Sequence, residues 1–177
     1  IPETLKLDGE LIAEVKPALL TVKCSAGRKA IRQLRDAMPP EIKILGVTVP
    51  TSFDEEGWIS MNPGLNIGNS VLRFADEAAE GGADGLVLSG RELQYLRCED
   101  HGFSEIVIPA IRPTWAWVKG DDQRRPVTPT AAFQQGATRI VAVRPVTGAV
   151  PNTEGRPESP REAVEWILKE IEQALGA

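Results

Sequence analysis

The sequence is poor in the residues that build disulfides and metal sites. Its two cysteines, Cys24 and Cys98, lie far apart, and His101 is the only histidine. This supply is too small for a disulfide framework or a zinc pattern. We therefore expect buried or idle thiols and no metal.

Long apolar runs are also lacking. No stretch approaches the roughly 18 apolar residues of a membrane-spanning helix. The first ten residues, IPETLKLDGE, have neither the basic start nor the apolar core of a signal peptide. We expect a cytoplasmic protein that makes no membrane contact.

No strong excess of positive charge is present. The 177 residues include 20 basic and 25 acidic side chains, which gives a net charge of -5. The basic residues are dispersed, which argues against nucleic acid as the main partner. With 42% hydrophobic residues, the composition is that of one globular domain over residues 1–177.

Five short apolar runs recur along the chain and predict strands buried on both faces, as in a parallel sheet. They are residues 18–23, 42–49, 85–90, 105–111 and 139–146. Helical patterns occupy residues 3–17, 26–38, 71–84, 128–136 and 159–176. The last two begin with Thr128-Pro129 and Ser159-Pro160, which are typical helix starts.

Alternating strands and helices indicate an α/β fold built from right-handed βα units. Two layouts fit: an open doubly wound sheet, or part of a (β/α) TIM-type barrel. A complete eight-unit barrel usually needs at least about 200 residues. The chain has only about five of the eight units.

Ligands of parallel α/β proteins bind beyond the carboxyl ends of the strands. Arg112 and Arg144 follow two consecutive predicted strands, and Gln123 lies in the loop between them. These side chains have the chemistry of a phosphate clamp. The alternative for each arginine alone is a surface residue or an ion-pair partner.

Other polar residues near strand ends have simpler interpretations as well. Thr51 and Ser52 would serve as caps of the following segment. The acidic pair of residues 121–122 would form a turn or pair with Arg124 and Arg125. Two tryptophans, at 115 and 117, would pack the loop down, with base stacking as the weaker alternative.

The run IPAIRPTWAWVKGDDQRRPVTPTAAFQQGATRIVAVRP resembles the end of bacterial orotidine 5'-phosphate decarboxylases, which read P-G-I-R-P, G-D-Q-R-R, T-P and G-R-P. VTVPTS at 47–52 and GGADGLVLSG at 81–90 resemble further blocks of that family. IPET at 1–4 is similar to the residues directly after the family's catalytic D-x-K-x-x-D. The similarity extends over essentially the whole chain in the same order.

The resemblance implies a role for each matching residue. Arg112, Gln123 and Arg144 would hold the substrate phosphate, with Gln123 in a loop that closes over it. Thr51 and Pro109 would lie at the pyrimidine. Ile1 and Thr4 would reach into the neighbouring site of a homodimer.

The sequence departs from the family pattern at several positions. Ala110 stands where the family has glycine, which we expect to be a mild change, and Val143 replaces the glycine before Arg144. The loop carries one extra aspartate. A valine at 143 is expected to crowd a backbone amide near the phosphate.

The family reaction converts orotidine 5'-monophosphate to uridine 5'-monophosphate (UMP) in pyrimidine biosynthesis, without metal or organic cofactor. Its lysine between aspartates supplies the proton after CO2 leaves, and this chain contains no D-x-K-x-x-D. We expect binding roles only, and no turnover by the isolated chain. Three explanations stay open: a piece of a longer enzyme that lacks an amino-terminal segment, one half of a split enzyme, or a non-catalytic nucleotide- or phosphate-binding remnant.

Overall fold

The protein, described by a computed structural model over residues 1–96, 101–117, 122–151 and 155–176, is built on one parallel sheet. Its strands lie in the order β1-β2-β3-β4-β5, and every neighbouring pair is parallel. Their bounds are Leu19–Lys23, Lys43–Val47, Gly85–Val87, Glu105–Ile108 and Arg139–Ile140. The five predicted strands and the parallel sheet are confirmed.

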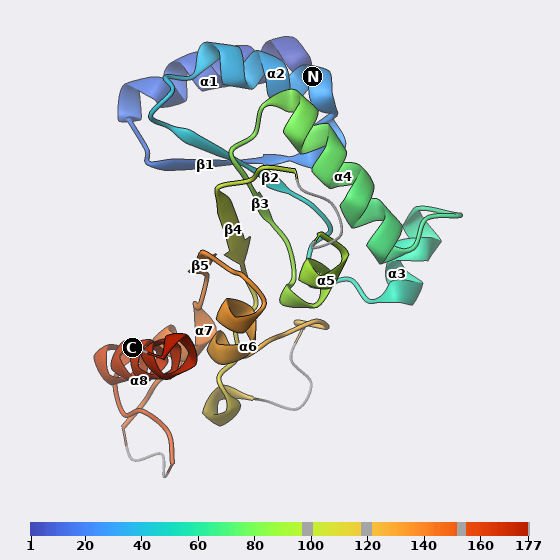
Figure 1. The fold of residues 1–177 in the computed structure, drawn as a ribbon. Coiled ribbons are helices and arrows are strands. Elements are labelled where there is room, and N and C mark those ends of the chain that lie inside the picture. Colours follow the sequence, from blue (N-terminus) through green and yellow to red (C-terminus); the bar gives the residue numbers. More distant parts are fainter. Residues whose placement is uncertain (97–100, 118–121, 152–154, 177) are drawn as a thin grey trace.

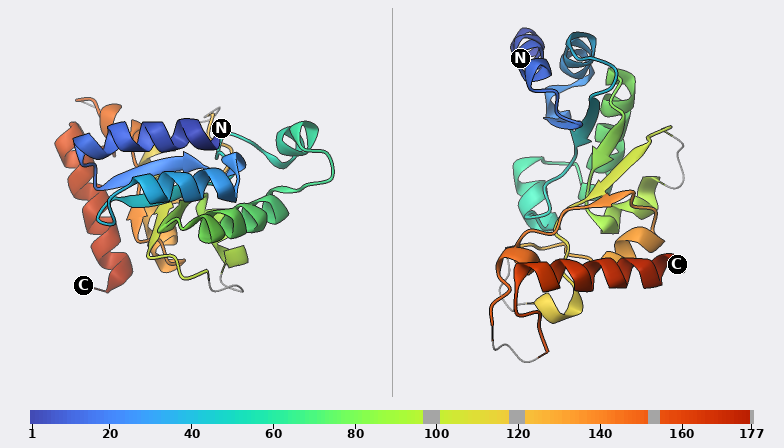
Figure 2. Two further views of the ribbon diagram at one scale, coloured as in Figure 1. Left: turned by 90° about the horizontal axis from the view of Figure 1, so that it is seen from above. Right: turned by 90° about the vertical axis from the view of Figure 1, so that its left-hand side faces the viewer.

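Helices alternate with the strands along the chain (Figures 1 and 2). The longer ones are α1 (Pro2–Val15), α2 (Arg28–Ala37), α4 (Ile67–Gly81) and α8 (Pro160–Leu175). Short helices are α3 (Glu55–Met61), α5 (Leu93–Leu96), α6 (Pro129–Gln134) and α7 (Arg144–Thr147). Helix α4 packs on β2 and β3, α1 packs on α2, and α8 packs on α6 and α7.

The predicted caps form because their side chains satisfy free N–H groups at the helix starts. Thr128 accepts from Ala131 N at 3.1 Å, and Ser159 accepts from Glu162 N at 3.2 Å. Asp54 caps α3. The capping interpretation of Thr51 and Ser52 is therefore wrong.

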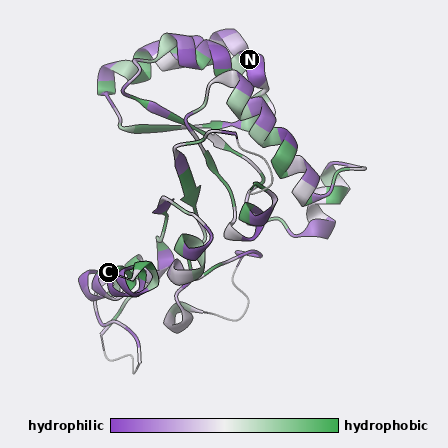
Figure 3. Ribbon diagram, viewed as in Figure 1, coloured by the Kyte–Doolittle hydropathy of each residue, from purple (hydrophilic) through white to green (hydrophobic). Residues whose placement is uncertain are grey.

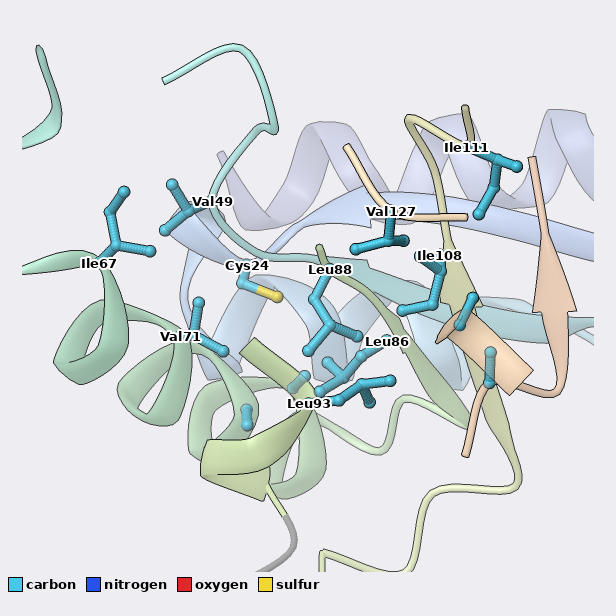
Figure 4. Close-up of a cluster of buried hydrophobic side chains, with 14 of the residues drawn as sticks. Cys24, Val49, Ile67, Val71, Leu86, Leu88, Leu93, Ile108, Ile111 and Val127 are labelled. Atoms are coloured by element: carbon cyan, nitrogen blue, oxygen red, sulfur yellow. The ribbon is translucent and has the colours of Figure 1, made fainter. Parts of the chain in front are cut away.

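The main hydrophobic core lies between the sheet and α4 and continues towards α6 (Figure 4). Gly46 of β2 makes this packing close, because a Cβ there would lie 2.7 Å from Cys24 Sγ and 2.9 Å from the Ala78 Cβ. Hydrophobic and hydrophilic residues alternate around α1, α4 and α8 (Figure 3). That pattern is typical of amphipathic helices.

Cys24 belongs to this core, and burial raises the pKa of its thiol to about 12. The expectation of a buried thiol is confirmed for Cys24. Cys98 lies outside the described residues. No group of three or more His, Cys, Asp and Glu side chains that could hold a metal occurs within residues 1–96, 101–117, 122–151 and 155–176.

Strands β4 and β5 end earlier than the sequence indicates. Pro109 has no N–H to donate to a ladder, and Ala110 adopts a positive φ of 59°, so extended backbone stops after Ile108. After β5, Pro145 stands in the first turn of α7. Proline favours a helix start and cannot continue a strand.

At the amino ends of the strands, Glu105 joins three strands through its carboxylate. It accepts from Lys43 Nζ at 2.5 Å and from Arg139 Nε at 2.8 Å. The hydrogen bonds from Arg139 and Lys43 lower the Glu105 pKa from 4.5 to about 2. This network lies at the opposite end of the sheet from the expected site.

Strands β1 and β5 form the two edges of the sheet, and the barrel is not closed. The arrangement is that of an open section of a TIM-type barrel. Several apolar side chains of the edge helices are exposed. They are Leu7, Leu11 and Val15 on α1 and Val164, Leu168 and Leu175 on α8. Among the described helices, none is both long and apolar enough to cross a membrane.

Candidate functional site

Residues 122–127, which we call the crossing segment, run across the carboxyl edge of the sheet. The carboxyl ends of parallel strands lie at one edge, so loops that follow different strands meet there. The crossing segment contacts the loops that follow β2, β3, β4 and β5. Gly120 and Asp121, at the start of the expected loop, lie outside the described residues.

Gln123 and Thr51 are in direct contact. The Thr51 hydroxyl donates to Gln123 Oε1 at 2.5 Å, and the backbone N–H of Arg124 donates to the Thr51 carbonyl at 3.2 Å. Thr51 is buried and Gln123 half-buried. The structure thus brings together a residue expected at the pyrimidine and one expected at the phosphate.

Arg112 is held firmly beside the crossing segment. Its backbone N–H donates to the Val127 carbonyl at 2.9 Å, and Ile111 forms a parallel bridge with Val127. Its guanidinium Nη1 donates to the Ile111 carbonyl at 2.9 Å, and the residue is 5% exposed. The arginine is therefore oriented by the protein.

The loop that carries Arg112 is fixed by tryptophans. Trp117 Nε1 donates to the Arg112 carbonyl at 2.9 Å. Trp115 packs edge to face on Trp166 of α8, with ring centroids 6.0 Å apart. These contacts favour the packing interpretation of both tryptophans.

Arg144 occupies the corresponding place after the next strand. The sheet register pairs Ile108 of β4 with Ile140 of β5. Arg112 comes four positions after Ile108, and Arg144 comes four positions after Ile140. Arg144 begins α7 and forms an ion pair with Asp122 of the crossing segment. Asp122 thus pairs with Arg144, and the expected pairing with Arg124 or Arg125 is wrong for it.

The two departures from the family glycines differ in consequence. Ala110 has φ of 59°, a left-handed conformation that costs an L-residue roughly 1–2 kcal/mol. The expectation of a mild change at Ala110 is therefore wrong. Val143 has φ of -97° and an exposed side chain, so its backbone does not need glycine.

Pro109 lies between the end of β4 and Arg112, half-buried at the same edge. Ile1 and Thr4 are exposed at the start of α1, with Ile1 87% exposed. Figure 1 shows α1 beginning beside the carboxyl end of β1, at the β1 edge of the sheet. Within one chain they lie away from Arg144, which follows β5 at the other edge.

Arg125 is a site component that sequence reasoning missed. Its guanidinium is buried, 6% exposed, and donates to the carbonyls of Val49, Pro50 and Phe53. Nη1 lies 2.6 Å from Oε1 of Glu92, a residue in the segment that follows β3. The sequence shows an arginine doublet, and nothing in it tells which of the two side chains is buried.

Burial raises the pKa of the Glu92 carboxyl, and the Arg125 charge partly opposes that effect. Desolvation disfavours a carboxylate unless an opposite charge compensates. Burial of the Glu92–Arg125 pair therefore costs desolvation free energy, and the fold nevertheless keeps this pair at the carboxyl edge.

A parallel sheet with cationic and amide side chains gathered at its carboxyl edge defines an α/β protein of the TIM-barrel type. The model of the Orotidine 5'-phosphate decarboxylase / HUMPS family matches residues 1–155. The chain therefore belongs to the Orotidine 5'-phosphate decarboxylase / HUMPS family.

Sequence similarity to individual orotidine 5'-phosphate decarboxylases supports this assignment. The orotidine 5'-phosphate decarboxylase of Gluconobacter oxydans is 37% identical over 156 residues, covering 84% of this chain and 65% of that protein. The one from Rhodospirillum rubrum is 32% identical over an alignment of 179 residues, covering 97% of this chain and 68% of that protein. The chain spans about two thirds of the length of these relatives.

Solved structures show the same fold. The crystal structure of the Lactobacillus acidophilus orotidine 5'-phosphate decarboxylase is similar with a TM-score of 0.75 at 28% identity, covering 97% of this chain and 70% of that one. An uncharacterized conserved protein from Geobacillus kaustophilus has a TM-score of 0.71 at 23% identity. The second likeness supports the fold alone.

Proposed function

We propose that this chain carries the phosphate- and pyrimidine-binding part of an orotidine 5'-phosphate decarboxylase. The observation that carries the proposal is the position of two consecutive residues, Asp122 and Gln123. Asp122 contacts Arg144 and Gln123 contacts Thr51. Residues expected at the two ends of a nucleotide thus meet on one segment.

In this proposal the phosphate binds Arg112, Gln123 and Arg144, and the pyrimidine binds beside Thr51 and Pro109. Guanidinium groups suit phosphate because their paired N–H donors match its oxygens. The Thr51–Gln123 hydrogen bond couples the two halves of the ligand. Binding energy from the remote phosphate would organise the crossing segment and raise turnover as well as affinity.

The chain's role in the reaction is binding alone. Decarboxylation breaks the bond to CO2 and needs a proton donor at the remaining carbon, and the 177 residues contain no D-x-K-x-x-D. We therefore propose that the chain binds UMP but does not decarboxylate orotidine 5'-monophosphate alone. Turnover would require an added amino-terminal βα segment that contains the motif.

The exposed apolar residues at both edges of the sheet support such a complement. Leu7, Leu11 and Val15 share one face of α1 at i, i+4 spacing.

Ile1 and Thr4 are exposed at the amino-terminal end of α1, as a dimer contact would need. We propose a homodimer that uses this end of α1.

Titration of UMP by calorimetry, with and without an amino-terminal fragment from a relative, tests the proposal. A decarboxylase part should bind UMP and gain turnover on complementation. The alternative, a non-catalytic nucleotide- or phosphate-binding remnant, is favoured by the missing motif and predicts binding without any gained turnover. Absence of UMP and phosphate binding would exclude both.

A further inference from the structure

Arg125 sits next to Arg124 in the sequence, yet the two side chains have opposite environments. Arg124 is exposed and contributes its backbone N–H to Thr51. The Arg125 side chain is buried; its Nε and Nη2 donate hydrogen bonds, whereas Nη1 forms an ion pair that does not have hydrogen-bond geometry. Nε donates to Phe53 O at 3.0 Å, Nη2 donates to Val49 O at 3.1 Å and Pro50 O at 2.8 Å, and Nη1 pairs with Glu92.

These partners belong to different loops at the carboxyl edge. Three are carbonyls of residues 49–53, the loop that presents Thr51. Glu92 follows β3, and the Ser89 hydroxyl from the same loop donates to the Arg125 carbonyl at 3.2 Å. Arg125 itself is two residues after Gln123. One side chain therefore ties the loops after β2 and β3 to the crossing segment.

We propose that Arg125, held by Glu92, is a positioning residue for the phosphate and pyrimidine groups. It does not touch the ligand. Its planar guanidinium fixes the 49–53 loop against the crossing segment. The Thr51 hydroxyl is thereby held within hydrogen-bonding distance of Gln123 Oε1. The inference rests on the proposed function, because the site that it positions is the one proposed above.

The chemistry requires arginine at this position. A guanidinium presents donors in a fixed planar fork and stays charged when buried, whereas a lysine ammonium is a compact point charge. Nε and Nη2 of the fork match three backbone carbonyls, and Nη1 faces the Glu92 carboxylate as an ion pair. Glu92, 3% exposed, supplies the opposite charge that a buried cation needs.

The test compares UMP binding by the wild-type chain with that of Arg125→Met, Arg125→Lys and Glu92→Gln. We expect Arg125→Met to weaken UMP binding at least about tenfold and Arg125→Lys to recover little of the loss. Glu92→Gln should show a smaller loss in the same direction. Wild-type-like UMP affinity in folded Arg125→Met would overturn the inference.

Two control variants separate positioning from general destabilisation. Arg161→Met removes an exposed guanidinium on α8, away from the crossing segment, and should leave UMP affinity within about twofold. Arg139→Met disrupts the Glu105 ion pair at the opposite end of the sheet and should lower stability while leaving affinity unchanged. If Arg139→Met weakens binding as much as Arg125→Met, positioning by Arg125 is refuted.

Hydrogen exchange supplies a readout that does not depend on the ligand. The amides of Arg124 and Arg112 donate to the carbonyls of Thr51 and Val127. Their exchange should become faster in Arg125→Met and stay unchanged in Arg139→Met. If wild type binds neither UMP nor phosphate, the proposed function fails, while this exchange pattern still decides whether Arg125 positions the loops.

Chemical rescue gives a second decision where Arg125→Met does not fold well. Arg125→Ala leaves space for a free guanidinium ion. Millimolar guanidinium chloride should restore UMP binding and amide protection in that variant, and equal sodium chloride should not. Equal effects of the two salts would contradict a specific role for the guanidinium.

Discussion

The Thr51 hydroxyl donates a hydrogen bond to Gln123 Oε1 at 2.5 Å, across 72 positions of sequence. This contact joins the loop after β2 to the crossing segment. It is the most direct link between residues expected at opposite ends of one ligand.

Thr51→Val removes the hydroxyl and keeps the shape, so it isolates that hydrogen bond. We expect UMP binding to weaken about three- to tenfold, in line with about 0.5–1.5 kcal/mol for one hydrogen bond. Gln123→Ala should weaken it further, because the amide also faces the phosphate in our proposal. Unchanged UMP affinity of Thr51→Val would show that the contact is irrelevant to binding.

Asp122 pairs with Arg144 and, in our proposal, competes there with the bound phosphate, since a carboxylate and a phosphate use the same donors. Asp122→Asn should strengthen phosphate and UMP binding about two- to fivefold, as expected for an exposed ion pair. The matched control is Glu165→Gln, which breaks the exposed pair with Arg161 on α8. Weaker binding by Asp122→Asn would mean that Asp122 orients Arg144 productively.

Ala110→Gly should stabilise the protein by about 1 kcal/mol, because glycine adopts the positive φ of this position without steric cost. Urea denaturation measures the change. The control Ala79→Gly, inside α4, should destabilise by a similar amount. A loss of stability in Ala110→Gly would contradict the left-handed conformation.

Stability should depend on pH through Glu105. Its pKa is about 2 in the folded protein and 4.5 ordinarily. The folded value is lower, so the carboxylate's contribution is fully present above about 4.5 and is lost as the pH falls towards 2. Thermal unfolding between pH 2 and 6 measures this.

Glu105→Gln should destabilise at neutral pH by about 1–3 kcal/mol and flatten that pH dependence. The half-exposed partners Lys43 and Arg139 stay solvated in this variant. An unchanged pH profile in Glu105→Gln would assign the acid sensitivity to other carboxylates.

Much of the fold follows from local pattern. Continuous apolar runs predict the five strands, and Thr128-Pro129 and Ser159-Pro160 mark two helix starts that the structure has. Strand ends were less predictable: Pro109 ends β4 within a run that still looks apolar, and β5 stops at Ile140, five residues before Pro145. Helix α3 was not predicted at all.

The site shows what a single sequence cannot reveal. Arg112 and Arg144 could be selected as candidate phosphate ligands from the sequence, because each follows a predicted strand. The role of Arg125 depends on carbonyls of residues 49–53 and on Glu92, which are distant in sequence. Only the fold brings these partners together. From the sequence alone, Arg124 and Arg125 therefore cannot be told apart as exposed and buried.

The central claim is that Arg112 and Arg144 share one phosphate. Calorimetric titration of UMP and of uridine into the wild-type chain, Arg112→Gln, Arg144→Gln and the double variant tests it directly. We predict that each single variant loses at least about tenfold in UMP affinity, with uridine binding unchanged and the double loss less than additive. Equal loss of uridine binding, or UMP affinity that survives both substitutions, would contradict the account.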